Sequence, residues 1–200
     1  MEAYGKVRPA LKTGDIVLFS GKGGISTGIK WFTDSKWSHV GMVLRLPEWD
    51  AVLLWESTTL GNIADVESGK EHKGVQLVPL SERIQKYQGE ASIRLLDIER
   101  TPEMLKKLSL LRAEVKGRQY EKHKIELFKA AYDGPFGANR EDLSSLFCSE
   151  MVAEAYQRMG LLSEKKASNE YTPRDFCDKA KVKLKLLKGA KLAKEVLVSA

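Results

Sequence analysis

A cysteine, a histidine and a glutamate are the residues of this chain whose types and settings suit covalent chemistry. A thiolate is a strong nucleophile, a histidine can serve as its base, and a carboxylate can orient the histidine. The candidates are Cys148, His39 and Glu56. If the fold brings them together, they form a nucleophile, base and orienter triad.

Cys148 is the better placed of the two cysteines. We predict a helix over 147–159, so that its thiol lies in the first turn, with Ser144 or Ser145 as the cap. There the helix dipole and the free N–H groups favour the thiolate. The alternative is a core position, since cysteine is often buried. Cys177 has acidic neighbours that disfavour a thiolate, and we predict a structural role for it.

His39 is the candidate base among the three histidines. It opens a predicted strand over 39–46 that is otherwise apolar, whereas His72 and His123 lie in charged segments and are predicted to be exposed. The alternative for His39 is a hydrogen-bonded histidine of the core.

The carboxylate comes from a predicted hairpin. The strands 39–46 and 51–57 are joined by the turn 47–50. With this turn, the residue numbers of two facing residues are expected to add up to 95 or 96, which places His39 opposite Glu56 or Ser57. A carboxylate in an apolar strand is costly to bury without a partner. The N–H of His39 would be such a partner.

The remaining pattern alternates strands and helices without an internal repeat. It predicts an α+β fold with a mostly antiparallel sheet packed against helices. Further strands are expected at 15–20, 75–78 and 92–98, with a terminal pair around Gly189. Further helices are expected at 25–32, 81–87, 101–116 and 120–132, with a short one opening at Thr172-Pro173 and a loop over 134–145.

The composition fits one globular domain over residues 1–200. A hydrophobic fraction of 42% with 30% charged residues excludes a disordered chain. No apolar run approaches the roughly 18 residues of a membrane span, and no apolar stretch opens the chain. Two cysteines are too few for a disulfide scaffold, so we expect a reduced, cytoplasmic protein. The glycine-rich run after Ser20 lacks the spacing of a phosphate-binding loop.

The net charge of +6 belongs to the C-terminal segment 179–200, which holds seven lysines and one glutamate. Between Lys179 and Lys185 lysines alternate with apolar residues, which predicts a half-buried strand with a lysine-lined outer face. The alternative is a specific anionic partner such as a membrane surface. No zinc-finger or basic-aromatic pattern indicates nucleic acid.

Six segments, in this order, resemble the circularly permuted NlpC-type papain-like cysteine hydrolases, in particular their YiiX-like branch, which is related to the lecithin-retinol acyltransferase-like enzymes. The segments are Thr13-Gly-Asp-Ile-Val-Leu-Phe, Ser38-His-Val-Gly-Met-Val-Leu, Trp55-Glu-Ser, Gly117-Arg-Gln-Tyr, Phe147-Cys-Ser-Glu-Met-Val and Tyr171-Thr-Pro-Arg-Asp-Phe. In the permuted group the histidine strand precedes the cysteine helix, as it does here.

The resemblance implies a permuted papain-like fold with Cys148 as nucleophile at a helix N-terminus, His39 as base and Glu56 as the third, polar residue. It places Tyr120 near the site and gives Asp15 a structural role. It implies a thioester acyl-enzyme, with N–H groups at the helix start as oxyanion donors and with no cofactor or metal. A peptide, amide or lipid-like ester is the expected substrate class. The alternatives are a lipid acyltransferase or phospholipase, and a binding module that has lost catalysis.

Overall fold

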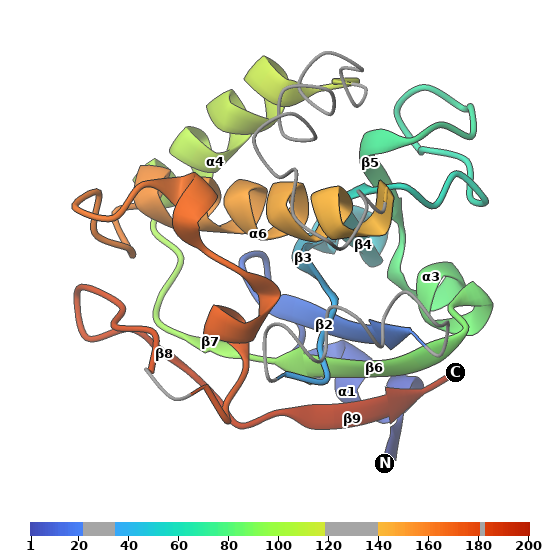
Figure 1. Ribbon diagram of the computed structural model, residues 1–200, viewed down its shortest axis with the longest axis horizontal. Helices are drawn as coiled ribbons and strands as arrows, with labels where there is room; N and C mark the ends of the chain where they lie inside the picture. The colour runs from blue at the N-terminus through green and yellow to red at the C-terminus, as the bar shows by residue number, and fades with distance from the viewer. Residues whose placement is uncertain (22–34, 119–139, 181–182) are drawn as a thin grey trace, which may run out of the picture.

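The computed structural model describes residues 1–21, 35–118, 140–180 and 183–200, with the backbone alone for 140–147. It is a mixed α/β structure in which helices pack against a mostly antiparallel sheet (Figure 1), as predicted. The helices predicted at 25–32 and 120–132 lie outside the described residues. So do Tyr120 and His123.

The main sheet has seven strands in the order β1-β9-β6-β2-β3-β4-β5. Only β1 and β9 pair in parallel among the described strands. The strands are β1 (Glu2–Ala3), β2 (Ile16–Gly21), β3 (His39–Leu46), β4 (Ala51–Thr58), β5 (Gly74–Pro79), β6 (Gly89–Arg94) and β9 (Val196–Ser199). A separate two-stranded sheet joins β7 (Leu96–Asp97) to β8 (Lys191–Leu192).

The helices lie on both sides of the sheet. They are α1 (Tyr4–Val7), α3 (Leu80–Lys86), α4 (Pro102–Val115) and α6 (Arg140–Arg158), with the 3-10 turns η1 (Arg8–Ala10), η2 (Pro47–Trp49), η3 (Ser168–Glu170) and η4 (Pro173–Phe176). The helix α4 begins as predicted, because Thr101 Oγ1 accepts a hydrogen bond from the Met104 N–H at 3.2 Å. Within the described ranges, no helix combines the length and the apolar character needed to cross a bilayer.

The sheet divides the core into two clusters. On one face α6 packs on β3 and β4, and α4 packs on α6 (Figure 1). This cluster includes Val40 and Met42 from β3. The other face includes Val43 and Leu54, together with residues of α1 and α3. Because side chains alternate along a strand, β3 and β4 supply both clusters and are apolar on both faces.

The start of α6 corrects one prediction. The helix begins at Arg140, so that 140–145 is helical where a loop was expected. Ser144 and Ser145 are therefore interior residues rather than caps, which serine tolerates at a modest cost. The acidic Glu141 and Asp142 suit the first turn of a helix. As a result Cys148 is the ninth residue of α6, in its third turn.

The lysine-rich segment also differs from the prediction. Its described residues between 179 and 186 form no strand, and both terminal strands follow Gly189 and pair with β7, β6 and β1. Leu184 and Leu186 nevertheless pack against the core, while Lys183 and Lys185 are exposed. The alternation thus reflects an extended segment lying on the core, without strand pairing.

Candidate functional site

The hairpin β3–β4 brings His39 and Glu56 together. Their atoms Nε2 and Oε2 are 2.8 Å apart. The pairing register of β3 and β4 differs from the prediction. The residue numbers of paired residues sum to 97, and extending this register to His39 places it opposite Thr58. The shift arises because all four residues from Pro47 to Asp50 lie in the connection. The two side chains are therefore diagonal neighbours on one face, which long side chains can bridge.

The Glu56 carboxylate is fully buried and holds four contacts from three side chains. Its Oε2 faces His39, whereas its Oε1 accepts hydrogen bonds from Arg83 Nε at 2.8 Å and Gln76 Nε2 at 3.0 Å. Arg83 Nη2 lies 2.7 Å from the same Oε1. Gln76 comes from the directly paired position on β5, and Arg83 comes from α3. Four contacts fix both the position and the orientation of the carboxylate.

These partners also set the charge of Glu56. Burial alone would raise the pKa of this carboxyl group, but the hydrogen bond from His39 and the positive charge of Arg83 hold the pKa below its usual value. The carboxylate is therefore an anion at neutral pH.

Cys148 completes the group from the side of α6. Burial alone would lower the pKa of His39, whereas the charge and hydrogen bond of Cys148, followed by those of Glu56, raise that pKa to about 9. His39 thus interacts with both candidate partners. The raised pKa favours a protonated imidazole that interacts with both Cys148 and Glu56.

The setting of Cys148 differs from the predicted one in two respects. In the third turn of α6 the backbone N–H groups bond within the helix, so neither the end of the helix dipole nor free N–H donors act on the thiol. The side chain also has no exposed surface.

Cys177 has the opposite electrostatic setting. It follows η4 and is 8% exposed. Burial raises the pKa of its thiol, and the charges of Glu195 and Asp178 raise it further. This environment suits the structural role that the sequence predicts.

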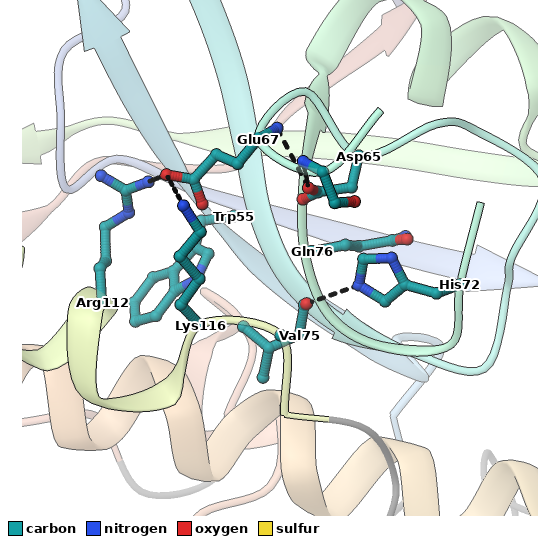
Figure 2. Close-up of a pocket in the computed structure, with 10 residues that line it drawn as sticks. Trp55, Asp65, Glu67, His72, Val75, Gln76, Arg112 and Lys116 are labelled. Carbon is teal, nitrogen blue, oxygen red and sulfur yellow. Dashed lines mark hydrogen bonds and ion pairs between the residues drawn. The ribbon is translucent and has the colours of Figure 1, made fainter. Parts of the chain in front are cut away.

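His72 is half-buried, so the prediction that it is exposed is wrong. Its Nε2 lies 3.0 Å from the carbonyl oxygen of Val75, and its Nδ1 lies 3.3 Å from that of Lys70 (Figure 2 shows the first contact). The two carbonyl groups that hold the ring belong to the loop before β5 and to β5 itself. Neither belongs to a residue of the predicted triad. Tyr120 lies outside the described residues.

A cavity of about 40 Å³ lies beside this histidine (Figure 2). Arg112 and Lys116 of the α4 end both reach Glu67, at 3.2 and 3.6 Å. Gln76 lines the cavity, but none of the three predicted catalytic residues does. The cavity is therefore separate from the sulfur and its base.

Arg83 and Gln76 are the site residues that sequence reasoning missed. A signal for Arg83 exists, because it lies between Leu80 and Ile84 at the helical spacing of a buried stripe. A charged residue on such a stripe requires a buried partner. Gln76 carries a weaker signal, as a polar residue within the apolar strand β5.

Comparison with known proteins assigns no family to the chain. No protein-family model matches it, and no curated protein does. Among solved structures it is similar to the crystal structure of the metalloprotein yiiX from Escherichia coli O157:H7 (DUF1105), with 22% sequence identity and a TM-score of 0.49. The match covers 74% of this chain and 66% of that chain, so this chain spans slightly less than two thirds of that protein.

Proposed function

We propose that the protein is a thiol hydrolase that cleaves an amide or ester through a thioester acyl-enzyme. The observation that carries the proposal is that His39 bonds Glu56 at 2.8 Å and also interacts with Cys148. A circularly permuted papain-like fold of the NlpC type is part of the same proposal. The order of the histidine strand before the cysteine helix supports it.

The reaction follows from the three side chains. The Cys148 sulfur attacks the acyl carbon, a C–S bond forms, and the leaving nitrogen or oxygen departs with a proton from the His39 imidazolium. Neutral His39 then takes a proton from water as that water attacks the thioester. The acid is released, and the thiolate and imidazolium are restored. Glu56 keeps its charge throughout and holds the imidazole in orientation.

A metal at this site is the alternative to consider, since yiiX is a metalloprotein. In the described part of the chain, no three His, Cys, Asp or Glu residues are grouped as metal ligands would be. Arg83 also occupies Oε1 of Glu56, and a guanidinium at this distance opposes a bound cation. The residues at the site do not fit a metal, and the proposed reaction has no step through one.

The test is an acyl-substrate screen of amides, peptides and esters with native protein and Cys148→Ala side by side. We expect turnover by the native protein alone, and a mass increase of one acyl group on Cys148 in rapidly quenched samples. Cys177→Ala is the matched control and should retain turnover and acylation. Turnover by Cys148→Ala would contradict the proposal, and ligand binding without acylation would support a binding module instead.

A lipid-like substrate is the second candidate, favoured by the exposed Lys183 and Lys185 next to the exposed Leu187. Basic residues near an anionic membrane contribute about 1 kcal/mol each. Vesicle binding should then rise with anionic lipid content, weaken with salt and fall in Lys183→Gln/Lys185→Gln. Binding that ignores lipid charge would favour a soluble amide or ester.

A further inference from the structure

Four side chains at the site form a buried row of alternating charge. Arg83 contacts Glu56, Glu56 contacts His39, and His39 interacts with Cys148. Arg83 and Glu56 have no exposed surface, and His39 is 8% exposed. With the sulfur as thiolate and the imidazole protonated, the row holds two cations and two anions.

Three neutral groups contact this row. Gln76 donates to Glu56, Asn62 Oδ1 accepts from Arg83 Nη1 at 2.9 Å, and the Phe19 ring lies 5.6 Å from the His39 ring. Lys86 is exposed, pairs with Glu82 at 2.8 Å and donates to the backbone carbonyl of Asn62. The three neutral contacts add no charge to the row.

Two anions in this setting need two cations. A buried charge without a partner is costly, and one imidazolium balances one anion. The start of α6 lies two turns away from Cys148 and supplies no compensating potential, because helix-end effects fade within the first turn. Among the residues that the structure describes, Arg83 is the second cation that contacts Glu56.

We propose that Arg83 is a positioning residue that allows the buried site to hold the Glu56 carboxylate and the Cys148 thiolate at the same time. By occupying Oε1, the guanidinium leaves Oε2 to orient His39. Because the charge of Arg83 balances that of Glu56, the charge of the His39 imidazolium remains available to balance the Cys148 thiolate. The catalytic meaning of this role rests on the proposed function, whereas the charge balance itself does not.

The charge balance fixes the sign of each substitution. Arg83→Met leaves two anions and one cation, so the sulfur should keep its proton to a higher pH. Glu56→Gln leaves two cations and one anion, so the imidazolium should lose its proton at a lower pH. The double variant restores one cation and one anion, and both titrations should return toward the native ones. A residue that serves only to support the fold would not produce opposite shifts that cancel.

The experiment is a titration that needs no substrate. Thiolate absorbance in the ultraviolet is measured for each variant, with the Cys148→Ser counterpart subtracted to remove Cys177, and His39 is followed by NMR. In Arg83→Met we expect the thiolate midpoint to rise by about one pH unit. Arg83→Lys keeps the positive charge but loses the planar guanidinium group, so its thiolate midpoint should stay closer to the native one.

Arg100→Met is the matched control, because Arg100 is the other arginine bound to a buried carboxylate, that of Asp15 at 2.7 Å. It should leave both titrations unchanged. If Arg83→Met does not fold, the double variant and Arg83→Lys still carry the test.

An unchanged thiolate midpoint in Arg83→Met would overturn the inference. So would a shift that persists in the double variant. If the titrations shift as expected while the native protein hydrolyses no acyl substrate, the charge balance stands and the proposed function falls. If the protein hydrolyses an acyl substrate and the titrations do not shift, the proposed function stands and the charge balance falls.

Discussion

Two buried carboxylates, Asp15 and Glu56, each lie beside an arginine, yet their partners differ in kind. Asp15 accepts backbone N–H groups from Leu96 and Lys12, both at 2.8 Å, as well as the guanidinium of Arg100. It joins its own segment to the backbone of β7. The contacts of Glu56 come from side chains, one of which is a histidine.

The protonation of the two groups differs accordingly. Burial raises the pKa of Asp15 above its usual value despite these N–H groups and Arg100, whereas the pKa of Glu56 is lowered by His39 and Arg83. A carboxylate held by backbone donors stabilises the fold. A carboxylate held by an imidazole and a guanidinium can also direct a proton transfer.

The largest expected difference is in turnover. Glu56→Gln should reduce kcat by about 10⁴-fold, as loss of the orienting carboxylate does in other triads. Asp15→Asn should lower stability but leave kcat per folded molecule nearly native. Steady-state assays with active-site titration measure both. Native kcat in Glu56→Gln, or an equal loss in Asp15→Asn, would remove the distinction.

The same substitutions should differ less in stability than in activity. Removing one partner of a buried ion pair costs about 3–5 kcal/mol, so Glu56→Gln is expected to destabilise the fold as well, because it deprives Arg83 of its anion. The double variant Glu56→Gln/Arg83→Met should recover part of this loss. Urea unfolding of the single and double variants measures the recovery, and a purely additive loss would show that the pair is not coupled.

The two cysteines extend the comparison to reactivity. Cys148 faces an imidazolium, whereas burial and nearby acids raise the pKa of Cys177. Iodoacetamide should therefore label Cys148 well below pH 8, and faster than Cys177 by about tenfold or more. Mass spectrometry of each cysteine peptide gives the rates. Equal rates, or faster labelling of Cys177, would contradict the assignment of Cys148 as the nucleophile.

The pH dependence of stability separates His39 from the carboxylates. The pKa of His39 is raised from 6.5 to about 9, so its contribution to stability is complete below about pH 6.5 and is lost as the pH rises toward 9. The loss should be on the order of 3 kcal/mol. Urea unfolding between pH 6 and 10 should show this slope in the native protein and a flatter one in His39→Ala.

The smallest expected effect is an opposite pH slope for the two carboxylates. The lowered pKa of Glu56 gives stability that is lost as the pH falls through the folded-state value, whereas the raised pKa of Asp15 gives stability that is lost as the pH rises through its own. Each amounts to about 1.4 kcal/mol per pKa unit. Acid unfolding of Asp15→Asn and Glu56→Gln should therefore depart from the native curve with opposite slopes, and parallel curves would contradict the assignment.

Much of the fold follows from local signals in the sequence. The strand His39–Leu46 and the helix after Thr101 were predictable because a turn or a cap marks each boundary. The start of α6 was not, because Ser144 and Ser145 fit a cap and a helix interior almost equally well. The alternation of lysines with apolar residues wrongly predicts strand pairing, because an extended segment that lies on the core shows the same period of two as a paired strand.

The sequence predicts the contact between His39 and Glu56, but it does not predict that Arg83 holds the Glu56 carboxylate. The contact between His39 and Glu56 survives a shift of register, because long side chains also reach diagonal positions. Arg83 comes from a different element, and no local pattern relates α3 to the hairpin. The position of Arg83 beside Glu56 therefore needed the three-dimensional structure.

The position of β9 has a consequence for how the protein is made. This strand lies between β1 and β6 (Figure 1), and β6 was synthesised about a hundred residues earlier. While the ribosome adds those residues, the hairpin of His39 and Glu56 can form, but β6 presents an open edge to other nascent chains. Such edges promote misassembly. Synthesis of Val196–Ser199 supplies the strand that covers this edge, so the edge of β6 is protected only when almost the whole of this sequence has been made.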